Sequence, residues 1–439
     1  MNEKITVLIV FILGFSMVEA QNWVALDSAK MNVINNGTLF LPDSITGKLF
    51  IAGDLTTIEG HQSWEIAAWD GSNWDTTYSF GAYGGGQIKS IIRYQNELYA
   101  CGAFSTACHK YTMSFTRWNA NCWDSLIINH HSNYIEDLRV YNNLLFMTGE
   151  IDTICGIYSP NSVAWNGNSF IPKGLPHWSS GNSMVCCVFH NALYFAGNFS
   201  DSIGFLYGFV KFDGTNWSMP YPGFGGLVQT MAVYNDELYI GGNYFAGGPA
   251  DFIVKWNDTT LSAVGSGLST GVGGLRVIDN KLFVLGTNMI RVWDGSNWSN
   301  FSNDSFNNAI LDVTIYNNEL YVLGGFTKIN GDSIGGVAKY NGWHLSDHDI
   351  KSTKGELEIF PNPTSDVLNI LLDLSAQDYH KQVSIKIIDV MGRTIIEKDE
   401  NSNTILQTVL NISDLSNATY LLQVIIGSKI YNKTFILNK

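Results

Sequence analysis

The sequence predicts an all-β protein, a seven-bladed β-propeller followed by a small Ig-like β-sandwich. A motif of Leu, an aromatic residue and, three positions later, Gly recurs seven times, with successive leucines 38 to 49 residues apart. Aromatic residues make up 13% of the chain and charged residues only 15%, with 43 glycines. This composition is typical of short strands joined by tight turns. Beyond the repeats, alternating apolar residues of a different pattern predict a second β domain.

Residues 1–20 are expected to be a signal peptide. Lys4 precedes an apolar run over residues 5–15, and Val18 and Ala20 are small residues at positions −3 and −1 of a cut before Gln21. The run is short for a membrane anchor. No other long apolar run follows, so no transmembrane segment is expected after cleavage. The net charge of −14, without a basic run, argues against a nucleic-acid partner.

Residues 21–343 are predicted to form seven repeats of four strands each. About twenty residues after most of the leucines comes an aromatic residue: Trp69, Trp118, Trp165, Phe212, Trp256, Trp293 and Tyr340. A second large apolar residue follows after a turn such as Asp70-Gly71-Ser72-Asn73, which is typical of a hairpin. Four-stranded units at this period indicate propeller blades. In the fifth repeat the strands are expected over 229–234, 238–242, 252–256 and 261–264.

The ends of the repeat region bear on the blade count. The inner strand of the first repeat, expected over 31–40, matches the pattern poorly. Residues 22–26 resemble the outer strand of a blade, so they are candidates to pair with the seventh repeat and close the ring.

Six cysteines occur, at positions 101, 108, 122, 155, 186 and 187. In an exported chain an even number suggests disulfides, but six cysteines allow 15 complete pairings, and the sequence does not choose among them. Cys108 and Cys155 occupy equivalent repeat positions. Structural roles are expected for all six, and no metal site or cofactor is predicted.

The tail differs from the repeats. Residues 344–354 are polar and are expected to be a linker. Residues 355–439 then carry Pro361-Asn362-Pro363, Asp389-Val390-Met391-Gly392-Arg393 and a final pair of strands that includes Tyr420. Alternating strands over about 85 residues favour a small β-sandwich.

Two resemblances follow from these motifs. The repeat units, from Leu98-Tyr99 through Trp118 and Trp123, resemble kelch-like and galactose-oxidase-type propellers of secreted proteins. This resemblance implies the fold only, because the oxidase's copper ligands have no counterpart here. The tail resembles the type A C-terminal sorting domain of type IX secretion in Bacteroidota. It implies sorting residues Pro361, Asn362, Pro363, Gly392, Arg393 and Tyr420. The implied partners are the type IX machinery and a sortase-like peptidase, and the implied location is the cell surface or the medium.

By the propeller resemblance, the strand before each Leu-aromatic pair is innermost and meets any ligand. Its polar residues are the ligand-binding candidates: Ser90, Arg93, Asp137, Arg139, Thr230, Arg276, Asp312 and Thr314. The alternative is that these side chains satisfy one another and bound water.

No catalytic set is predicted, because no hydrolase elbow, zinc-protease motif or phosphate loop occurs. The sequence therefore favours a secreted or surface binding module for a glycan or a protein. A propeller hydrolase or lyase acting on polysaccharide stays the alternative, since the fold supports either.

Overall fold

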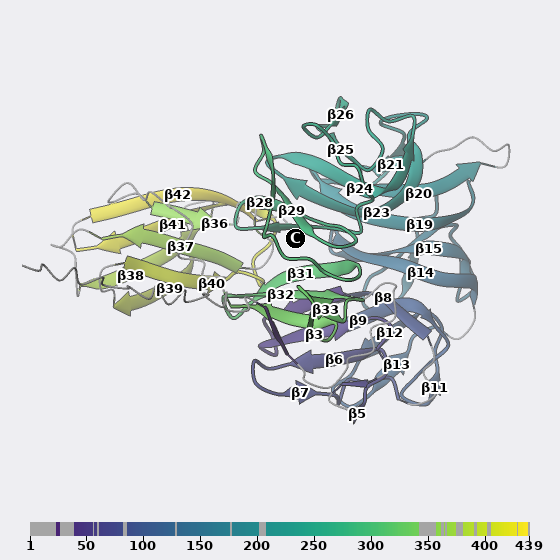
Figure 1. Ribbon diagram of the computed structural model, residues 1–439, viewed down its shortest axis with the longest axis horizontal. Helices are drawn as coiled ribbons and strands as arrows, with labels where there is room; N and C mark the ends of the chain where they lie inside the picture. The colour runs from purple at the N-terminus through teal and green to yellow at the C-terminus, as the bar shows by residue number, and fades with distance from the viewer. Residues whose placement is uncertain are drawn as a thin grey trace, which may run out of the picture.

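The computed structural model describes residues 23–26, 39–55, 57–58, 61–81, 86–127, 130–175, 178–201, 208–341, 357–360, 364, 367–374, 381–389, 393–401, 405–427 and 429–437. Every regular element in these ranges is a β-strand, so the all-β prediction is confirmed. The predicted signal peptide, the linker and Trp343 lie outside them. The tail strands form a body of their own at the left of Figure 1.

Seven antiparallel sheets in the described ranges share one plan: in six of them the four main strands follow each other as in the sequence, and in the last one β1 takes the fourth place. Their first strands are β2 (Leu39–Asp43), β8 (Gly86–Tyr94), β14 (His130–Tyr141), β19 (Trp178–Phe189), β23 (Gly225–Tyr234), β27 (Gly274–Ile278) and β31 (Ile310–Tyr316). Their second strands are β3 (Lys48–Ala52), β9 (Glu97–Phe104), β15 (Leu144–Ile154), β20 (Ala192–Asp201), β24 (Glu237–Ala246), β28 (Lys281–Leu285) and β32 (Glu319–Gly324).

The outer half of each sheet follows the same plan. The third strands are β6 (Ile66–Trp69), β12 (Phe115–Trp118), β17 (Ser162–Trp165), β21 (Phe209–Phe212), β25 (Ile253–Trp256), β29 (Ile290–Trp293) and β35 (Val337–Tyr340). The fourth are β7 (Trp74–Asp75), β13 (Trp123–Ser125), β18 (Phe170–Pro172), β22 (Trp217–Ser218), β26 (Leu261–Ala263), β30 (Trp298–Asn300) and, in the last sheet, β1 (Trp23–Ala25). Additional short strands are β4 (Thr57–Ile58), β5 (His61–Gln62), β10 (Thr106–Ala107), β11 (Lys110–Tyr111), β16 (Ile157–Tyr158), β33 (Lys328–Ile329) and β34 (Asp332–Ser333).

The repeated residues hold equivalent places in every sheet. Each landmark Leu of a second strand lies opposite the landmark aromatic residue of the third strand, from Leu49 with Trp69 to Leu320 with Tyr340. Each landmark Gly donates its N–H to a carbonyl near the start of the third strand. At Gly102 an added Cβ would lie 1.9 Å from the carbonyl oxygen of Gln87 on the first strand. A side chain would therefore push the first two strands apart.

The two ends of the repeat region pair with each other. Trp23 of β1 pairs with Tyr340 of β35, so a strand from the start of the chain completes the last sheet, as the sequence suggested for residues 22–26. The first sheet's inner strand is described over Leu39–Asp43, and residues 31–38 of its expected range lie outside the described ranges.

Apolar side chains join successive sheets. Each of seven buried clusters combines residues from two neighbouring sheets, and one combines Leu49 and Ile51 of the first with Tyr321 and Leu323 of the last. Successive first strands also contact each other, and β31 contacts β2. We call these seven first strands the inner ring.

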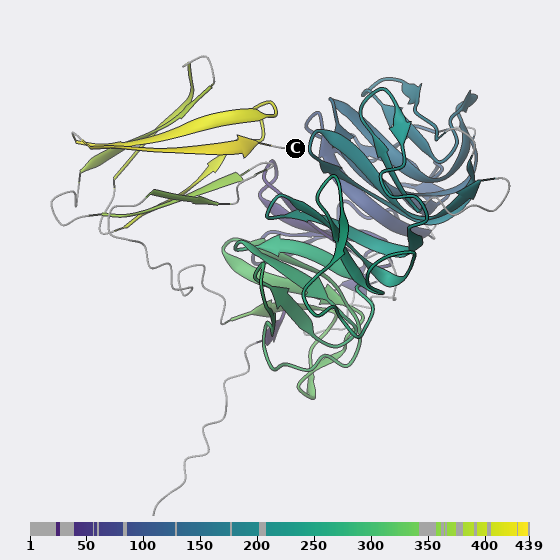
Figure 2. The same cartoon turned by 90° about the horizontal axis from the view of Figure 1, so that it is seen from above.

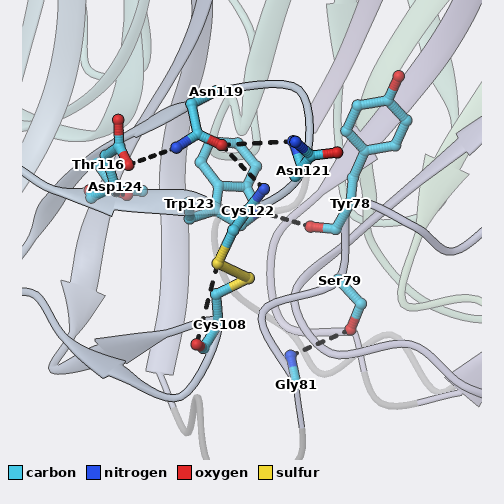
Figure 3. Close-up of a disulfide and its surroundings, with 10 residues drawn as sticks. All are labelled: Tyr78, Ser79, Gly81, Cys108, Thr116, Asn119, Asn121, Cys122, Trp123 and Asp124. Carbon is cyan, nitrogen blue, oxygen red and sulfur yellow. Dashed lines mark hydrogen bonds between the residues drawn. A yellow bond between two sulfur atoms is a disulfide. The ribbon is translucent and has the colours of Figure 1, made fainter.

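One disulfide occurs among the described cysteines, between Cys108 and Cys122 (Figure 3). It ties the turn between β10 and β11 to the turn between β12 and β13. Cys155 holds the place of Cys108 in the next sheet, but Ser169 stands where Cys122 would be, so Cys155 is an exposed thiol. Cys101, Cys186 and Cys187 are also unpaired with other cysteines.

The tail consists of two antiparallel sheets, which Figure 2 shows as two layers. One contains β36 (Leu357–Phe360), β37 (Val367–Asp373) and β40 (Ile405–Asn411). The other contains β38 (Gln382–Ile388), β39 (Thr394–Asn401), β41 (Ala418–Ile426) and β42 (Lys429–Leu437). Alternate residues of both sheets, such as Ile370 and Val424, pack into one core.

Candidate functional site

All eight candidate ligand-binding residues lie on the inner ring. Ser90 and Arg93 belong to β8, Asp137 and Arg139 to β14, Thr230 to β23, Arg276 to β27, and Asp312 and Thr314 to β31. Each first strand is the edge strand of its sheet. Each first strand also contacts the first strands of the two neighbouring sheets.

Four of the eight hold one repeat position, opposite the residue that precedes the landmark Gly. They are Ser90, Asp137, Thr230 and Asp312, and all four are buried. We call this the fastener position, because its side chains bond to the first strand of the next sheet. Asp312 accepts the N–H of Phe40 at 2.8 Å, and Thr230 accepts the N–H of Leu275 at 3.1 Å. These bonds satisfy buried edge-strand donors that have no partner strand.

Asp137 joins three sheets. Its Oδ1 accepts hydrogen bonds from the Ser90 hydroxyl at 3.1 Å and the Leu138 N–H at 2.8 Å. Its Oδ2 accepts the N–H of Cys186 at 3.1 Å. Burial raises the pKa of the Cys186 thiol, and the charge of Asp137 raises it further, so this sulfur stays protonated at neutral pH.

The three candidate arginines are each tied to a buried carboxylate. Arg276 binds Asp312 with two nitrogens, Nε to Oδ1 and Nη2 to Oδ2, both at 2.8 Å. Arg139 donates through Nε to the Cys186 carbonyl at 2.8 Å and lies 3.5 Å from Asp137 Oδ2. The charge of Asp137 raises the pKa of the Arg139 guanidinium.

Arg93 does not pair with a residue of the fastener position, because it lies nearer the hairpin end of β8. It binds Asp43 through Nε at 2.8 Å and Nη2 at 2.7 Å. Burial favours the neutral form of Asp43, but hydrogen bonds from Arg93 and Thr46 outweigh burial and hold its pKa below the usual value. Thr314 is half-buried on β31, two residues after the fastener position.

Sequence reasoning missed a second row of bonds between sheets. Four residues after the fastener position, a tyrosine hydroxyl donates to a carbonyl in or beside the hairpin turn of the next sheet. The donors are Tyr94, Tyr141, Tyr234 and Tyr316, at 2.7 to 3.1 Å. The sequence does contain a signal for this second row, because each of these tyrosines stands four residues before a landmark Leu.

The three remaining junctions between successive sheets carry charged pairs instead. Asp43 with Arg93 joins the first two sheets, and Arg276 with Asp312 joins the last two. Between the fourth and fifth sheets, His190 Nε2 lies 2.8 Å from Asp236 Oδ1, and its Nδ1 contacts Asp258. Every junction therefore has a polar bridge as well as an apolar core.

In two ion pairs of the inner ring, the guanidinium is accessible and the carboxylate is buried. The side chain of Arg139 is 38% exposed and that of Arg276 is 41% exposed. Their partners Asp137 and Asp312 are 10% and 2% exposed. The carboxylate oxygens are occupied by bonds between sheets, so the accessible part of each pair is the guanidinium.

Glu65, at the start of β6, is a second unusual residue that the sequence did not reveal. Its backbone is left-handed, with φ of 64°, where the next two sheets have Ser114 and Asn161. The residue is only 3% exposed, and its Oε2 has no hydrogen-bond partner among the described residues. Burial raises its pKa from 4.5 to about 8. The Gly86 N–H opposes this shift, and the charge of Asp54 adds to it.

In the described ranges, no group of three or more His, Cys, Asp or Glu side chains is arranged to hold a metal ion. Burial raises the pKa of Cys187 to about 11, so this half-buried thiol of the inner ring is not a thiolate at neutral pH. No helix long and apolar enough to cross a membrane is found within the residues described.

The sorting motif is partly described. Pro361, Asn362, Pro363 and Gly392 lie outside the described residues. Arg393 closes the hairpin between β38 and β39, because its N–H and Nε bond the Asp389 carboxylate at 2.9 and 2.8 Å. Tyr420 is buried, and its hydroxyl donates to the Ser416 carbonyl at 2.8 Å. Both residues therefore stabilise the tail fold.

Comparison with known proteins agrees with these features of the tail. Residues 358–438 match the family model of the secretion system C-terminal sorting domain. None of the curated proteins matches the chain. The tail is thus a sorting domain of type IX secretion. It indicates a secreted or cell-surface protein that interacts with that secretion machinery.

Proposed function

We propose that the chain is a secreted or cell-surface binding module, exported by type IX secretion through its tail. In this proposal, residues 1–20 are a signal peptide and residues 21–343 a seven-bladed, kelch-like β-propeller. A linker at 344–354 then joins an Ig-like sorting domain at 355–439. A Bacteroidota origin and final release or attachment by a sortase-like peptidase belong to the same proposal.

The closed circuit of sheet contacts supports the propeller. Seven buried clusters link seven successive sheets, and β1 completes the last sheet with a strand from the start of the chain. Joining the two ends of the chain in one sheet is a physical means of holding such a ring together.

One observation supports binding at the inner ring more than any other. Arg139 and Arg276 stay accessible while their carboxylate partners are buried and held by bonds between sheets. Polar groups held rigidly on a scaffold are what a ligand site for a sugar or a peptide requires. The ligand is proposed to be a glycan or another surface protein.

Glu65 favours the alternative, a polysaccharide hydrolase or lyase, because a carboxyl group with a pKa of about 8 suits a general acid. However, this side chain is 3% exposed, and a catalytic acid must reach its substrate. We therefore rank binding first.

The test is a glycan array probed with the purified full chain, with polysaccharide breakdown assayed in parallel. Saturable binding without product is expected. Product release would replace the binding proposal with the enzyme. Failure to bind glycans would leave a protein ligand, to be sought by crosslinking the displayed protein on intact cells, and failure there too would overturn binding.

Export is tested separately by deleting residues 358–438. The truncated chain is expected to stay inside the cell envelope, whereas the full chain reaches the medium or the surface. Normal export of the truncated chain would overturn the role of the tail.

A further inference from the structure

Each of the seven first strands carries a half-buried residue at one equivalent position. These residues follow the fastener position by two: Leu41, Ile92, Arg139, Cys187, Ala232, Arg276 and Thr314. Each of these strands is the edge strand of its sheet and contacts the first strands of the neighbouring sheets. In the proposed propeller, these seven side chains are the ones offered to a ligand inside the ring.

The two charged members of this set are both positive. Arg139 and Arg276 are the charged residues among the seven, and their exposed fractions of 38% and 41% exceed those of their carboxylate partners. The chain as a whole has a net charge of −14. The accessible charge of these two ion pairs is therefore cationic, whereas the carboxylates that balance it are buried.

Both guanidinium groups are held in place. Arg276 is fixed by Asp312 and by the Leu275 carbonyl at 3.3 Å from Nη1. Arg139 is fixed by the carbonyls of Cys186 and Leu138 at 2.8 and 3.2 Å. Because these side chains are already ordered, binding a ligand costs them little rotamer entropy. A planar guanidinium with free N–H groups matches carboxylate and sulfate oxygens.

We infer that the inner ring recognises an anionic sugar unit, one that carries a carboxylate or a sulfate group. Arg139 and Arg276 bind the anionic oxygens, and Thr314 offers a hydroxyl to the sugar. Leu41 and Ile92, from the adjacent first and second sheets, provide an apolar part of the ring for the C–H face. This inference rests on the proposed binding function and specifies its ligand class.

The experiment is calorimetric titration of the full chain with three oligosaccharides of equal length. They are oligogalacturonate, sulfated oligogalactan and neutral oligogalactan, each measured at low and at moderate salt. Binding of at least one acidic oligosaccharide is expected to be at least tenfold tighter than binding of the neutral one. It should weaken as salt rises, because salt screens charge. The two acidic arms distinguish a carboxylate from a sulfate ligand.

Variants locate the binding to the ring. Arg139→Gln and Arg276→Gln each remove one cation, and Thr314→Asp adds a negative charge without touching either carboxylate partner. Each is expected to weaken acidic-oligosaccharide binding at least tenfold. Arg117→Gln is the matched control, since Arg117 is bound by Glu97 and Asp124 away from the ring, both at 3.2 Å, and binding should not change.

Each outcome decides one point. Equal affinity for acidic and neutral oligosaccharides would overturn the anionic preference and leave the binding function intact. Unchanged affinity in Thr314→Asp and in both arginine variants would also overturn the inference, because the ligand would then bind elsewhere. If none of the three binds, the inference fails, whereas the binding function fails only if the glycan array and the crosslinking are negative as well.

Discussion

The substitution Glu65→Gln tests whether a buried, protonated carboxyl group reduces the stability of the folded chain. Burial raises the pKa of Glu65 from 4.5 to about 8. Between these two values the folded state holds a proton that the unfolded state has released. Stability therefore falls as pH rises, by about 1.4 kcal/mol per pH unit. The stability that this bound proton contributes is fully present below the pKa of the unfolded state. It is lost as pH rises through the pKa of the folded state.

Glutamine has nearly the same shape but no charge, so it keeps the left-handed backbone strain and removes only the ionisation. The variant is expected to be more stable than the parent chain by about 3 kcal/mol at pH 7, with almost no difference near pH 4. The magnitude is about 2.5 pH units, from 4.5 to 7, multiplied by the cost per unit.

The assay is urea unfolding followed by tryptophan fluorescence at several pH values between about 4 and 8. Glu319→Gln is a control of opposite sign. Burial favours the neutral form of Glu319, but hydrogen bonds from Lys339 and Tyr321 outweigh it and lower the pKa. That variant should be less stable than the parent near neutral pH, and its deficit should shrink as pH falls. A difference for Glu65→Gln that does not depend on pH would refute the reasoning.

Three further predictions concern the junctions between sheets and the disulfide. Tyr141→Phe removes the hydroxyl that donates a hydrogen bond to the next sheet at 2.9 Å. Urea titrations should show a free energy of unfolding lower by about 0.5–1.5 kcal/mol. No loss would show that water replaces this bond without cost. Burial disfavours the charged form of His190, but the hydrogen bonds that it donates to Asp236 and Asp258 outweigh burial and raise its pKa. The stability advantage of the parent over His190→Asn should therefore be full at acidic pH and shrink as pH rises through the raised pKa; a thermal-unfolding difference that grows with pH would contradict this. Cys122→Ser opens a loop of 14 residues and should cost about 3 kcal/mol, whereas mild reductant should leave the variant unchanged and destabilise the parent; equal sensitivity to reductant would mean that Cys108 does not form this disulfide in the protein.

The sequence predicted well the features that repeat. Leu, aromatic and Gly landmarks recur because each sheet solves the same packing problem, and the structure pairs Leu49 with Trp69 as it pairs Leu320 with Tyr340. The tail motifs were equally clear, since their order along the chain carries the signal. The pairing of Trp23–Ala25 with the last sheet agrees with the local pattern of residues 22–26, although the paired strands lie near opposite ends of the repeat region.

The disulfide could not be predicted from the sequence. Its pairing depends on two hairpin turns that approach each other only in the folded sheet, and Cys155 at the equivalent position has no such partner. Glu65 reads as an ordinary polar residue before a strand. Its left-handed backbone and its burial are visible only once the sheets are packed.

The list of candidate residues drawn from the sequence combines two groups. Some of them hold neighbouring sheets together, and others are accessible to a ligand. Ser90, Asp137, Thr230 and Asp312 were chosen for polarity, but their side chains are buried between sheets, and their direct effect is on stability. We propose that the binding chemistry falls instead to Arg139 and Arg276, because a buried carboxylate bonded to the next sheet holds each guanidinium in a fixed, accessible position. The buried aspartates thus hold neighbouring sheets together and also orient the arginines. Removing Asp312 would disturb both functions at once, whereas changing Thr314 reaches the ring without disturbing its assembly. For this reason, substitutions at the exposed positions, and not at the buried ones, can separate ligand recognition from folding.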